Sequence, residues 1–130
     1  MDYRDFCDRF MAALQAGDRD ALAAMMHPDF RVEEAESLPY GGVYRGVDGW
    51  LTLARAVIRA WKEFEIRPIE FPGESQDRFL VRFRISGRSR KTEKPFETTV
   101  LELWSFHEGR LIEIAPYYFD THALVMADTP

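Results

Sequence analysis

Residues 96–119, FETTVLELWSFHEGRLIEIAPYYF, contain the pattern that decides the fold. Phe96–Phe106 and Arg110–Phe119 are both expected to be strands, and along Phe96–Phe106 both faces carry apolar residues, since side chains two apart share a face. Between them His107-Glu108-Gly109 is a short link that contains glycine, which is typical of a hairpin. The stretch therefore predicts two adjacent antiparallel strands near the C-terminus.

The neighbouring sequence extends this sheet. Phe64–Phe71 and Arg78–Gly87 are expected to be strands, and the charged segment Ser89–Pro95 connects the second of them to the pair above. A fifth strand is expected from Asp29, because apolar and charged side chains alternate after it. Residues 36–46 are rich in turn formers and are expected to form a loop.

Three segments have the three- and four-residue apolar spacing of a helix. They are residues 2–16, residues 19–26 between Gly17 and His27-Pro28, and a longer segment for which Asp48 is the expected N-cap. The order is helix, helix, strand, helix and then four strands. This order predicts one α+β domain over residues 1–130, with three helices gathered on one face of a mainly antiparallel sheet.

Composition narrows the class of partner. The net charge of -5 repels a phosphate backbone, so nucleic-acid binding is not expected. No apolar run approaches the ~20 residues that span a bilayer, and the single Cys7 cannot form an intrachain disulfide, so a cytoplasmic location is expected. Aromatic residues make up 14% of the chain, which favours an aromatic-lined cavity or a subunit interface.

Three stretches carry a resemblance to a known family: GDRDALAAMMHPDF at 17–30, SLPYGGVYRG at 37–46 and FHEGRLIEI at 106–114. They resemble the nuclear transport factor 2-like superfamily, especially its SnoaL-like polyketide cyclase and ketosteroid isomerase branches. The resemblance implies a cone-shaped barrel, formed by a strongly curved sheet around the helices, with a pocket between them. That superfamily includes isomerases, cyclases, dehydratases, epoxide hydrolases and proteins without catalysis, so the fold alone does not choose a function.

Glu34 is the first candidate for chemistry. It shares a sheet face with Phe30 and Val32, so it should point toward the core, where desolvation would raise its pKa and suit it to act as a general base. The resemblance places it where ketosteroid isomerases have their catalytic aspartate. An equally weighted alternative is a strand-end carboxylate in water, and Glu36 is a weaker candidate on the same face.

Glu102 is the second candidate, because it shares a face with Val100 and Trp104. The resemblance places it where ketosteroid isomerases hold a protonated aspartate that donates to the substrate oxyanion; the alternative is a buried structural carboxyl. Phe10 lies where those enzymes have a tyrosine that completes the oxyanion hole, and it has no donor. Tyr118 is expected either to supply a hydroxyl from another wall or simply to line the pocket.

The expected site contains neither a metal nor a cofactor, since the three histidines lack metal-ligand spacing and no hydrolase triad is assembled. The loop around Tyr40 is either a lid or a plain connection. The predicted catalytic residues are Glu34, Glu102 and Tyr118, and the predicted pocket residues are Phe10, Val32, Glu36, Tyr40, Trp50, Trp61, Val100, Trp104 and Ile114.

Two functions remain open: an isomerase- or cyclase-like proton transfer on an apolar, carbonyl-containing substrate, or non-catalytic binding of a small apolar or aromatic molecule. The convex face of the sheet, opposite the face that carries Glu102 and Trp104, predicts a second partner, which is another copy of the chain. Leu101 and Leu103 should project there beside Ala115, Tyr117 and Phe119 on the last strand. This apolar surface, together with the resemblance, predicts a twofold homodimer.

Overall fold

A computed structural model describes all residues from Met1 to Pro130. The helices are α1 (Tyr3–Ala16), α2 (Arg19–Met25), α3 (Gly46–Ala60) and α4 (Thr121–Ala127). The strands are β1 (Met26–Glu34), β2 (Gly42–Arg45), β3 (Trp61–Glu74), β4 (Arg78–Ser89), β5 (Pro95–His107) and β6 (Arg110–Tyr118). None of the helices has the length and apolar character needed to cross a bilayer.

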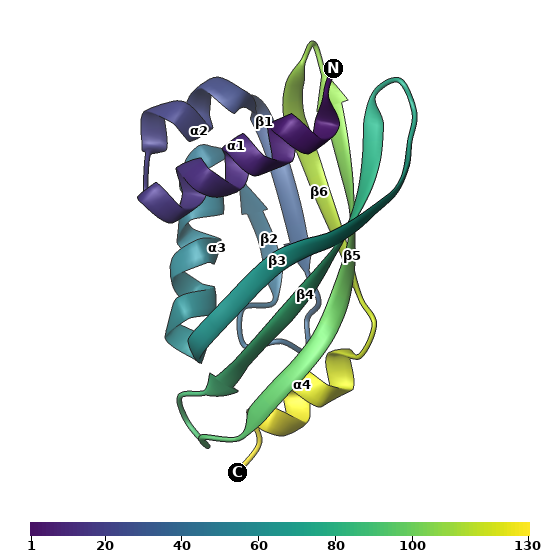
Figure 1. Cartoon of the computed structure of the whole chain (residues 1–130). Coiled ribbons are helices and arrows are strands. Elements are labelled where there is room, and N and C mark those ends of the chain that lie inside the picture. The colour runs from purple at the N-terminus through teal and green to yellow at the C-terminus, as the bar shows by residue number, and fades with distance from the viewer.

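The six strands form one curved sheet in the order β2-β1-β6-β5-β4-β3. All neighbours are antiparallel except β1 and β6, which are parallel, and the sheet is not closed because β2 and β3 are free edges. Helices α1, α2 and α3 lie on the same side of the curved sheet (Figure 1). The predicted α+β class and mainly antiparallel sheet are confirmed.

The sheet and α1 are held together largely by aromatic side chains. Phe6 and Phe10 of α1 are buried, and each packs edge-on against Trp104 of β5. Asp2 caps the start of α1 through the backbone N–H of Asp5, and Gly17 ends it in the left-handed conformation. The helix is thereby fixed in length, with its apolar face on the concave side of the sheet.

The structure adds two elements that the sequence did not predict. Strand β2 lies inside the expected loop 36–46, where Val43 pairs opposite Glu33 of β1. Helix α4 follows β6, and the carboxylate of Asp120 caps it by accepting from the N–H of Ala123. Both elements are short, four and seven residues respectively, so neither shows a clear apolar period.

Some predicted boundaries were wrong. Helix α3 begins at Gly46 rather than after Asp48, whose carboxylate accepts a hydrogen bond from Arg19 at 3.0 Å instead of capping the helix. Strand β1 begins at Met26, and His27 accepts from the backbone N–H of Asp29 rather than bonding the last carbonyls of a helix. At Asp48 a contact with a distant residue therefore replaces the expected cap, whereas at His27 the replacing hydrogen bond is local.

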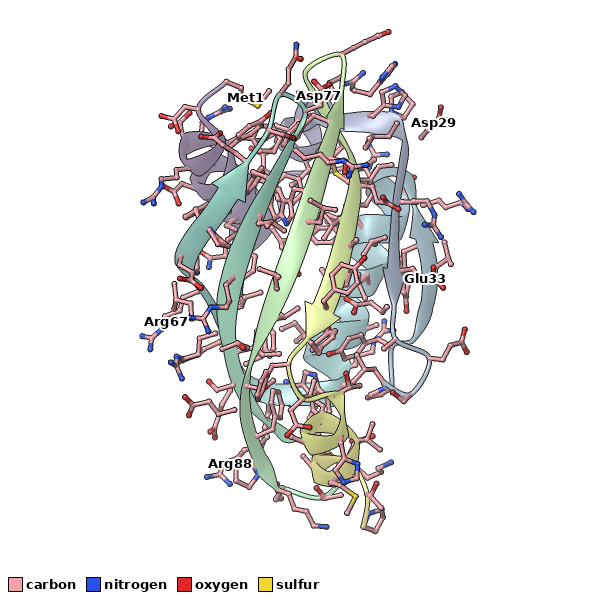
Figure 2. The ribbon with its side chains drawn as sticks, turned by 90° about the vertical axis from the view of Figure 1, so that its right-hand side faces the viewer. Met1, Asp29, Glu33, Arg67, Asp77 and Arg88 are labelled. Atoms are coloured by element: carbon pink, nitrogen blue, oxygen red, sulfur yellow. The ribbon has the colours of Figure 1, made fainter.

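Helices α1–α3 leave the convex face of the sheet uncovered, and Figure 2 looks onto this face. Tyr117 of β6 is strongly exposed, at 62%, and so is Phe119, at 84%, which follows the end of β6 and donates its backbone N–H to the carbonyl of Thr99 of β5. Leu101, Leu103 and Ala115 are half-buried beside them. These five residues are called the convex apolar patch below.

Candidate functional site

A cavity of about 650 Å³ lies between helices α1 and α3 and the concave face of the sheet. Its wall is mainly apolar, and every strand of the sheet except β2 contributes to it. The lining residues are Met11, Leu14, Gln15, Glu34, Tyr40, Trp50, Leu53, Ala54, Val57, Ile58, Phe64, Glu65, Ile66, Arg67, Phe83, Ile85, Val100, Glu102, Trp104 and Tyr118.

The charged groups of the cavity fall into two sets. Glu65 and Arg67 are exposed residues of the edge strand β3 and form part of the rim, and the Arg67 side chain extends toward solvent in Figure 2. Glu34 and Glu102 are less exposed and project from β1 and β5. The interior therefore presents two carboxyl groups in apolar surroundings, and the only cationic group in the lining is at the rim.

Glu34 is the last residue of β1 and is only 7% exposed. The hydroxyl of Tyr118, the last residue of β6, donates a hydrogen bond to its Oε1 at 2.9 Å. Burial raises the pKa of Glu34 to about 8; the Tyr118 hydrogen bond lowers it, and the nearby charge of Glu102 raises it. A carboxyl group with this pKa exchanges a proton readily near neutral pH.

Glu102 lies in the middle of β5, between Val100 and Trp104 on the same face of the strand. The indole Nε1–H of Trp104 donates to its Oε1 at 2.9 Å. Burial raises the pKa of Glu102 to about 7, against the lowering effect of that hydrogen bond. A sizeable fraction of Glu102 is therefore protonated near neutral pH and is able to donate a hydrogen bond.

A second buried polar contact, between Tyr40 and Trp61, lies near Glu34. The Nε1–H of Trp61 donates to the hydroxyl of Tyr40 at 3.2 Å. Burial raises the pKa of Tyr40 to about 12 and is the largest cause of the raised pKa of Tyr118. Both tyrosines therefore stay protonated at neutral pH.

The structure places seven of the predicted site residues in the cavity wall: Glu34, Tyr40, Trp50, Val100, Glu102, Trp104 and Tyr118. Phe10, Val32, Trp61 and Ile114 are buried outside the lining. Phe10, for example, packs against Trp50 and Trp104. Those two rings, and not Phe10, line the cavity. Glu36 is exposed and lies outside the lining, because β1 ends at Glu34 and its alternation ends with it.

Sequence reasoning missed the parts of the wall that come from helix stripes and from β3 and β4. Leu53 and Val57 of α3 line the cavity, as do Phe64 of β3 and Phe83 of β4. The apolar stripe of α3 that includes Leu53 and Val57 was a usable signal, because the same stripe supplies Trp50. The contribution of β3 depends on its position at the sheet edge, which no local pattern specifies.

The loop between β1 and β2 is packed inward in this structure. Tyr40 is 4% exposed, and the hydroxyl of Tyr44 donates to its carbonyl at 2.9 Å. A Cβ on Gly41 would lie 2.6 Å from the carbonyl oxygen of Ala35, so only glycine fits there without a shift of the backbone. The loop thus supports the cavity floor.

One polar atom near the cavity has no partner. The Nε1 of Trp50 is buried and makes no hydrogen bond, whereas the indole N–H groups of Trp61 and Trp104 are both paired. A buried donor without an acceptor costs about 1–3 kcal/mol. No cluster of three or more metal-ligating side chains is present.

Comparison with known proteins places the chain in a family. The family model of the SnoaL-like domain matches residues 7–114. The chain belongs to the SnoaL-like domain family. The match runs from α1 through most of β6 and so includes Glu34 and Glu102. A search of curated proteins found no match.

Solved structures that are similar to this SnoaL-like protein have the same fold. A nuclear transport factor 2-like protein from Burkholderia xenovorans LB400 is 26% identical, with a TM-score of 0.83 over 96% of this chain and 94% of that one. TerC, co-crystallised with polyporic acid, is 18% identical, with a TM-score of 0.76 over 94% and 96%. A protein of ketosteroid isomerase-like fold from Catenulispora acidiphila DSM 44928, in complex with trimethylamine, is 13% identical, with a TM-score of 0.75 over 96% and 93%.

Proposed function

We propose that this SnoaL-like protein is a cofactor-independent isomerase or cyclase that moves a proton next to the carbonyl group of an apolar substrate. The observation that carries the proposal is that Glu34 and Glu102 line one apolar cavity with pKa values raised toward neutrality. A shared cavity is what a two-carboxyl mechanism requires, since one group must take a proton while the other stabilises the charge that develops.

In the proposed step, the carboxylate of Glu34 removes a proton from the carbon next to the carbonyl. The C–H electron pair moves into a new C–C double bond, and the carbonyl oxygen becomes an enolate oxygen. Protonated Glu102 donates a hydrogen bond to that oxygen. Where the substrate carries a C=C bond conjugated with the enolate, the dienolate takes the proton back from Glu34 at the far carbon of that bond, which isomerises the substrate. Where it carries a second carbonyl, the enolate carbon attacks that carbonyl, the C=O π bond breaks, and the new alkoxide oxygen takes the proton from Glu34 as the ring closes.

Tyr118 supports the base in this scheme. Its hydroxyl hydrogen is directed to Oε1 of Glu34, so it stabilises the carboxylate form. Glu102 is then left as the donor to the substrate oxygen. Phe10 supplies no hydroxyl, and the missing donor is worth roughly 10²–10³ in rate in enzymes that use one.

The substrate class follows from the wall and the rim. A volume of about 650 Å³ falls in the range of small-molecule sites, and the aromatic wall favours a molecule with a planar apolar body. Gln15 and Arg67 at the rim offer hydrogen-bond donors to a polar end that remains near solvent.

One observation favours a second function, non-catalytic binding of a ligand that contains a basic nitrogen. The ketosteroid isomerase-like neighbour is in complex with trimethylamine. In this chain two carboxyl groups and the aromatic rings of Trp50 and Trp104 line the cavity, and such a site attracts an ammonium group through ion pairing and cation–π contact. Binding would then hold both carboxyls in their charged form.

Ligand binding separates the two functions. Thermal-shift and calorimetric titrations would use 2-tetralone, an apolar ketone, together with polyporic acid and trimethylamine as probes. The proposed enzyme is expected to bind the ketone, with weaker binding after Val57→Glu in the wall and unchanged binding after Glu33→Gln on the convex face. Stabilisation by trimethylamine with no response to the ketone would contradict the enzyme proposal and favour the second function.

We also propose that the convex apolar patch joins two copies of the chain. Ion pairs surround the patch, including Arg31 with Glu113 at 3.0 Å and Arg82 with Glu70 at 2.6 Å. An apolar centre with a polar rim is the usual anatomy of a protein interface. A twofold contact would bury Phe119 and its neighbours twice, once on each copy.

A further inference from the structure

We propose that Trp104 is a positioning residue that holds the carboxyl group of Glu102 so that its Oε2, and not its Oε1, faces the ligand. This inference rests on the proposed function, because it takes Glu102 as the donor to the substrate oxygen. It gives a specific role to a ring that is otherwise part of the cavity wall.

The hydrogen bond between these two residues has only one possible direction. Glu102 and Trp104 are two residues apart on β5, so their side chains lie on the same face of the strand. The indole Nε1 lies 2.9 Å from Oε1 of Glu102. An indole N–H donates and cannot accept, so Oε1 is the acceptor in the charged and in the neutral form of Glu102.

In neutral Glu102 this bond decides which oxygen carries the proton. The carbonyl oxygen of a carboxylic acid is a better acceptor than its hydroxyl oxygen, so the oxygen that faces the indole remains the carbonyl. A proton on Oε1 would weaken the bond and leave a buried N–H less well satisfied, which costs free energy. The proton therefore lies on Oε2, and Oε2–H is the group that donates to a ligand.

Oε2 of Glu102 is open to the cavity. The bond from Trp104 is the only hydrogen bond of the Glu102 side chain, so Oε2 has no partner in the protein. Among side-chain nitrogen and oxygen atoms, only Nε1 of Trp50 and Nε of Arg110 are both sealed off and unpartnered. Oε2 is not sealed off in this way, and Glu102 lines the cavity, so Oε2 faces the space in which a ligand would bind.

Aromatic packing holds the Trp104 ring in place. The residue is only 1% exposed. Phe6 and Phe10 of α1 pack edge-on against it with ring centroids 6.4 and 5.3 Å away, and the ring of Phe79 of β4 lies at 5.1 Å. Because rings from α1 and β4 confine the indole, the hydrogen bond forms with little further loss of side-chain freedom.

Few other groups compete for Glu102. Glu34 of β1 is the charged residue that interacts with it, and Cys7 of α1 lies near it as a neutral thiol, because burial raises the pKa of Cys7 to about 12. Its partners on the adjacent strands are Val81 and Pro116, which carry no charge. The lining residues of α1 and α3 are also uncharged, and the charged ones of β3 are at the rim. The indole hydrogen bond is therefore the main effect that lowers the pKa of Glu102 against burial.

The test is a titration of the Glu102 carboxyl carbon by NMR in ligand-free protein labelled with ¹³C-glutamate. Glu34→Gln is the background, so that only one of the two cavity carboxyls titrates, and the signal is assigned by its loss when Glu102→Gln is added. Trp104 is replaced with benzothienylalanine, which keeps the shape of the ring but has sulfur in place of the N–H group. The midpoint is expected to rise by about one pH unit, the effect of losing one hydrogen bond to a charged group.

The same replacement at Trp50 is the matched control. Trp50 lines the same cavity, but its Nε1–H has no acceptor, so the Glu102 midpoint is expected to stay unchanged. An equal shift at both positions, or no shift at Trp104 in protein that near-UV circular dichroism shows to be folded, would overturn the positioning role.

Infrared difference spectra between these proteins and their Glu102→Gln counterparts at pH 5 test which oxygen carries the proton. The C=O stretch of neutral Glu102 is expected to move to higher frequency when Trp104 is replaced, because the carbonyl oxygen loses its donor. An unmoved stretch would mean that Oε1 is the hydroxyl oxygen and would overturn the assignment.

A further measurement needs no change at Trp104. In Glu34→Gln protein labelled with ¹⁵N-tryptophan, the indole N–H proton of Trp104 is expected to move downfield as Glu102 ionises, because a charged acceptor makes a stronger hydrogen bond. The indole protons of Trp50 and Trp61 do not contact Glu102 and are expected not to follow. A Trp104 signal that ignores the Glu102 titration would also overturn the proposal. Since no substrate is present, these results stand even if wild-type protein never turns over a ketone, which would be the failure of the proposed function instead.

Discussion

The hydroxyl of Tyr118 donates to Oε1 of Glu34 at 2.9 Å and so joins the last residue of β6 to the last residue of β1. These strands are parallel neighbours, with Val32 beside Ile114, and they run together to the same end of the sheet. The sheet order thus brings together two groups that are 84 residues apart in the chain. The chemistry proposed for the cavity depends on this contact.

The first prediction concerns the pH dependence of activity. Glu34 must be deprotonated to act as the base, and Glu102 must be protonated to act as the donor, with pKa values of about 8 and about 7. The rate of proton transfer should therefore rise as Glu34 loses its proton, fall as Glu102 loses its own, and have a maximum between these values. Steady-state rates measured from pH 5 to pH 10 check this.

Glu102→Gln tests the assignment of the two limbs. The amide stays neutral at every pH, so the falling limb should disappear. The rising limb should then report the pKa of Glu34 alone, because a neutral amide at position 102 does not titrate. A profile that keeps its falling limb would show that another group is the acid.

The second prediction concerns stability. The pKa values of Glu34 and Glu102 are raised in the folded state, so the folded protein binds more protons than the unfolded chain between about pH 4.5 and pH 8. The free energy of unfolding should fall as pH rises through this window. Urea unfolding at pH 5 and pH 8.5 should show Glu34→Gln more stable than wild type at the higher pH by on the order of a few kcal/mol, with a smaller difference at pH 5.

Glu33→Gln is the matched control for that comparison. Glu33 is exposed and lies on the convex side of β1, where it pairs with Arg31 at 3.3 Å. Its removal should change stability by less than about 1 kcal/mol at either pH. Equal effects of Glu33→Gln and Glu34→Gln at pH 8.5 would argue against the burial of Glu34 as the cause.

The third prediction concerns the loop that carries Tyr40. Gly41→Ala should destabilise the protein by roughly 1–3 kcal/mol, because the new Cβ would meet the backbone of Ala35 and Glu36 at 2.6–2.8 Å. Gly73→Ala is the control, because a Cβ there meets nothing within 4 Å, and no loss of stability beyond about 0.5 kcal/mol is expected.

Part of this arrangement could be predicted from the sequence, because it depends on local alternation. Phe30 and Val32 turn inward on β1, and the same period turns Glu34 inward. On β5, Val100 and Trp104 do the same for Glu102. A period of two specifies the face of a strand without any knowledge of its neighbours.

The rest depends on contacts between distant segments. The pairing of β1 with β6 is a crossover that no local pattern encodes, so the bond from Tyr118 to Glu34 could not be predicted. The same is true of Trp61, which was expected in the wall but lies behind Tyr40. Strand β2 is stabilised mainly by its pairing with β1, and its own four residues carry too weak a signal.

The fourth prediction concerns assembly. The chain should sediment as a dimer at micromolar concentration, and Leu103→Glu should shift it to a monomer of 15.2 kDa. Burying a leucine is worth roughly 1.5–3 kcal/mol, and a buried glutamate without a partner opposes the contact. Ala12→Glu adds the same charge on the exposed side of α1 and should leave the dimer intact. A stable wild-type monomer would contradict the proposed role of the convex apolar patch.

The most direct test of the central claim, that Glu34 moves a proton on a carbonyl substrate in this cavity, is the exchange of the α hydrogens of 2-tetralone in deuterium oxide, followed by proton NMR. Wild-type protein should accelerate the exchange over buffer, and Glu34→Gln should lower that acceleration by roughly 10²–10⁴-fold, while Glu33→Gln keeps it. Equal acceleration by wild type and Glu34→Gln, or bound ketone that never exchanges in wild type, would contradict the account.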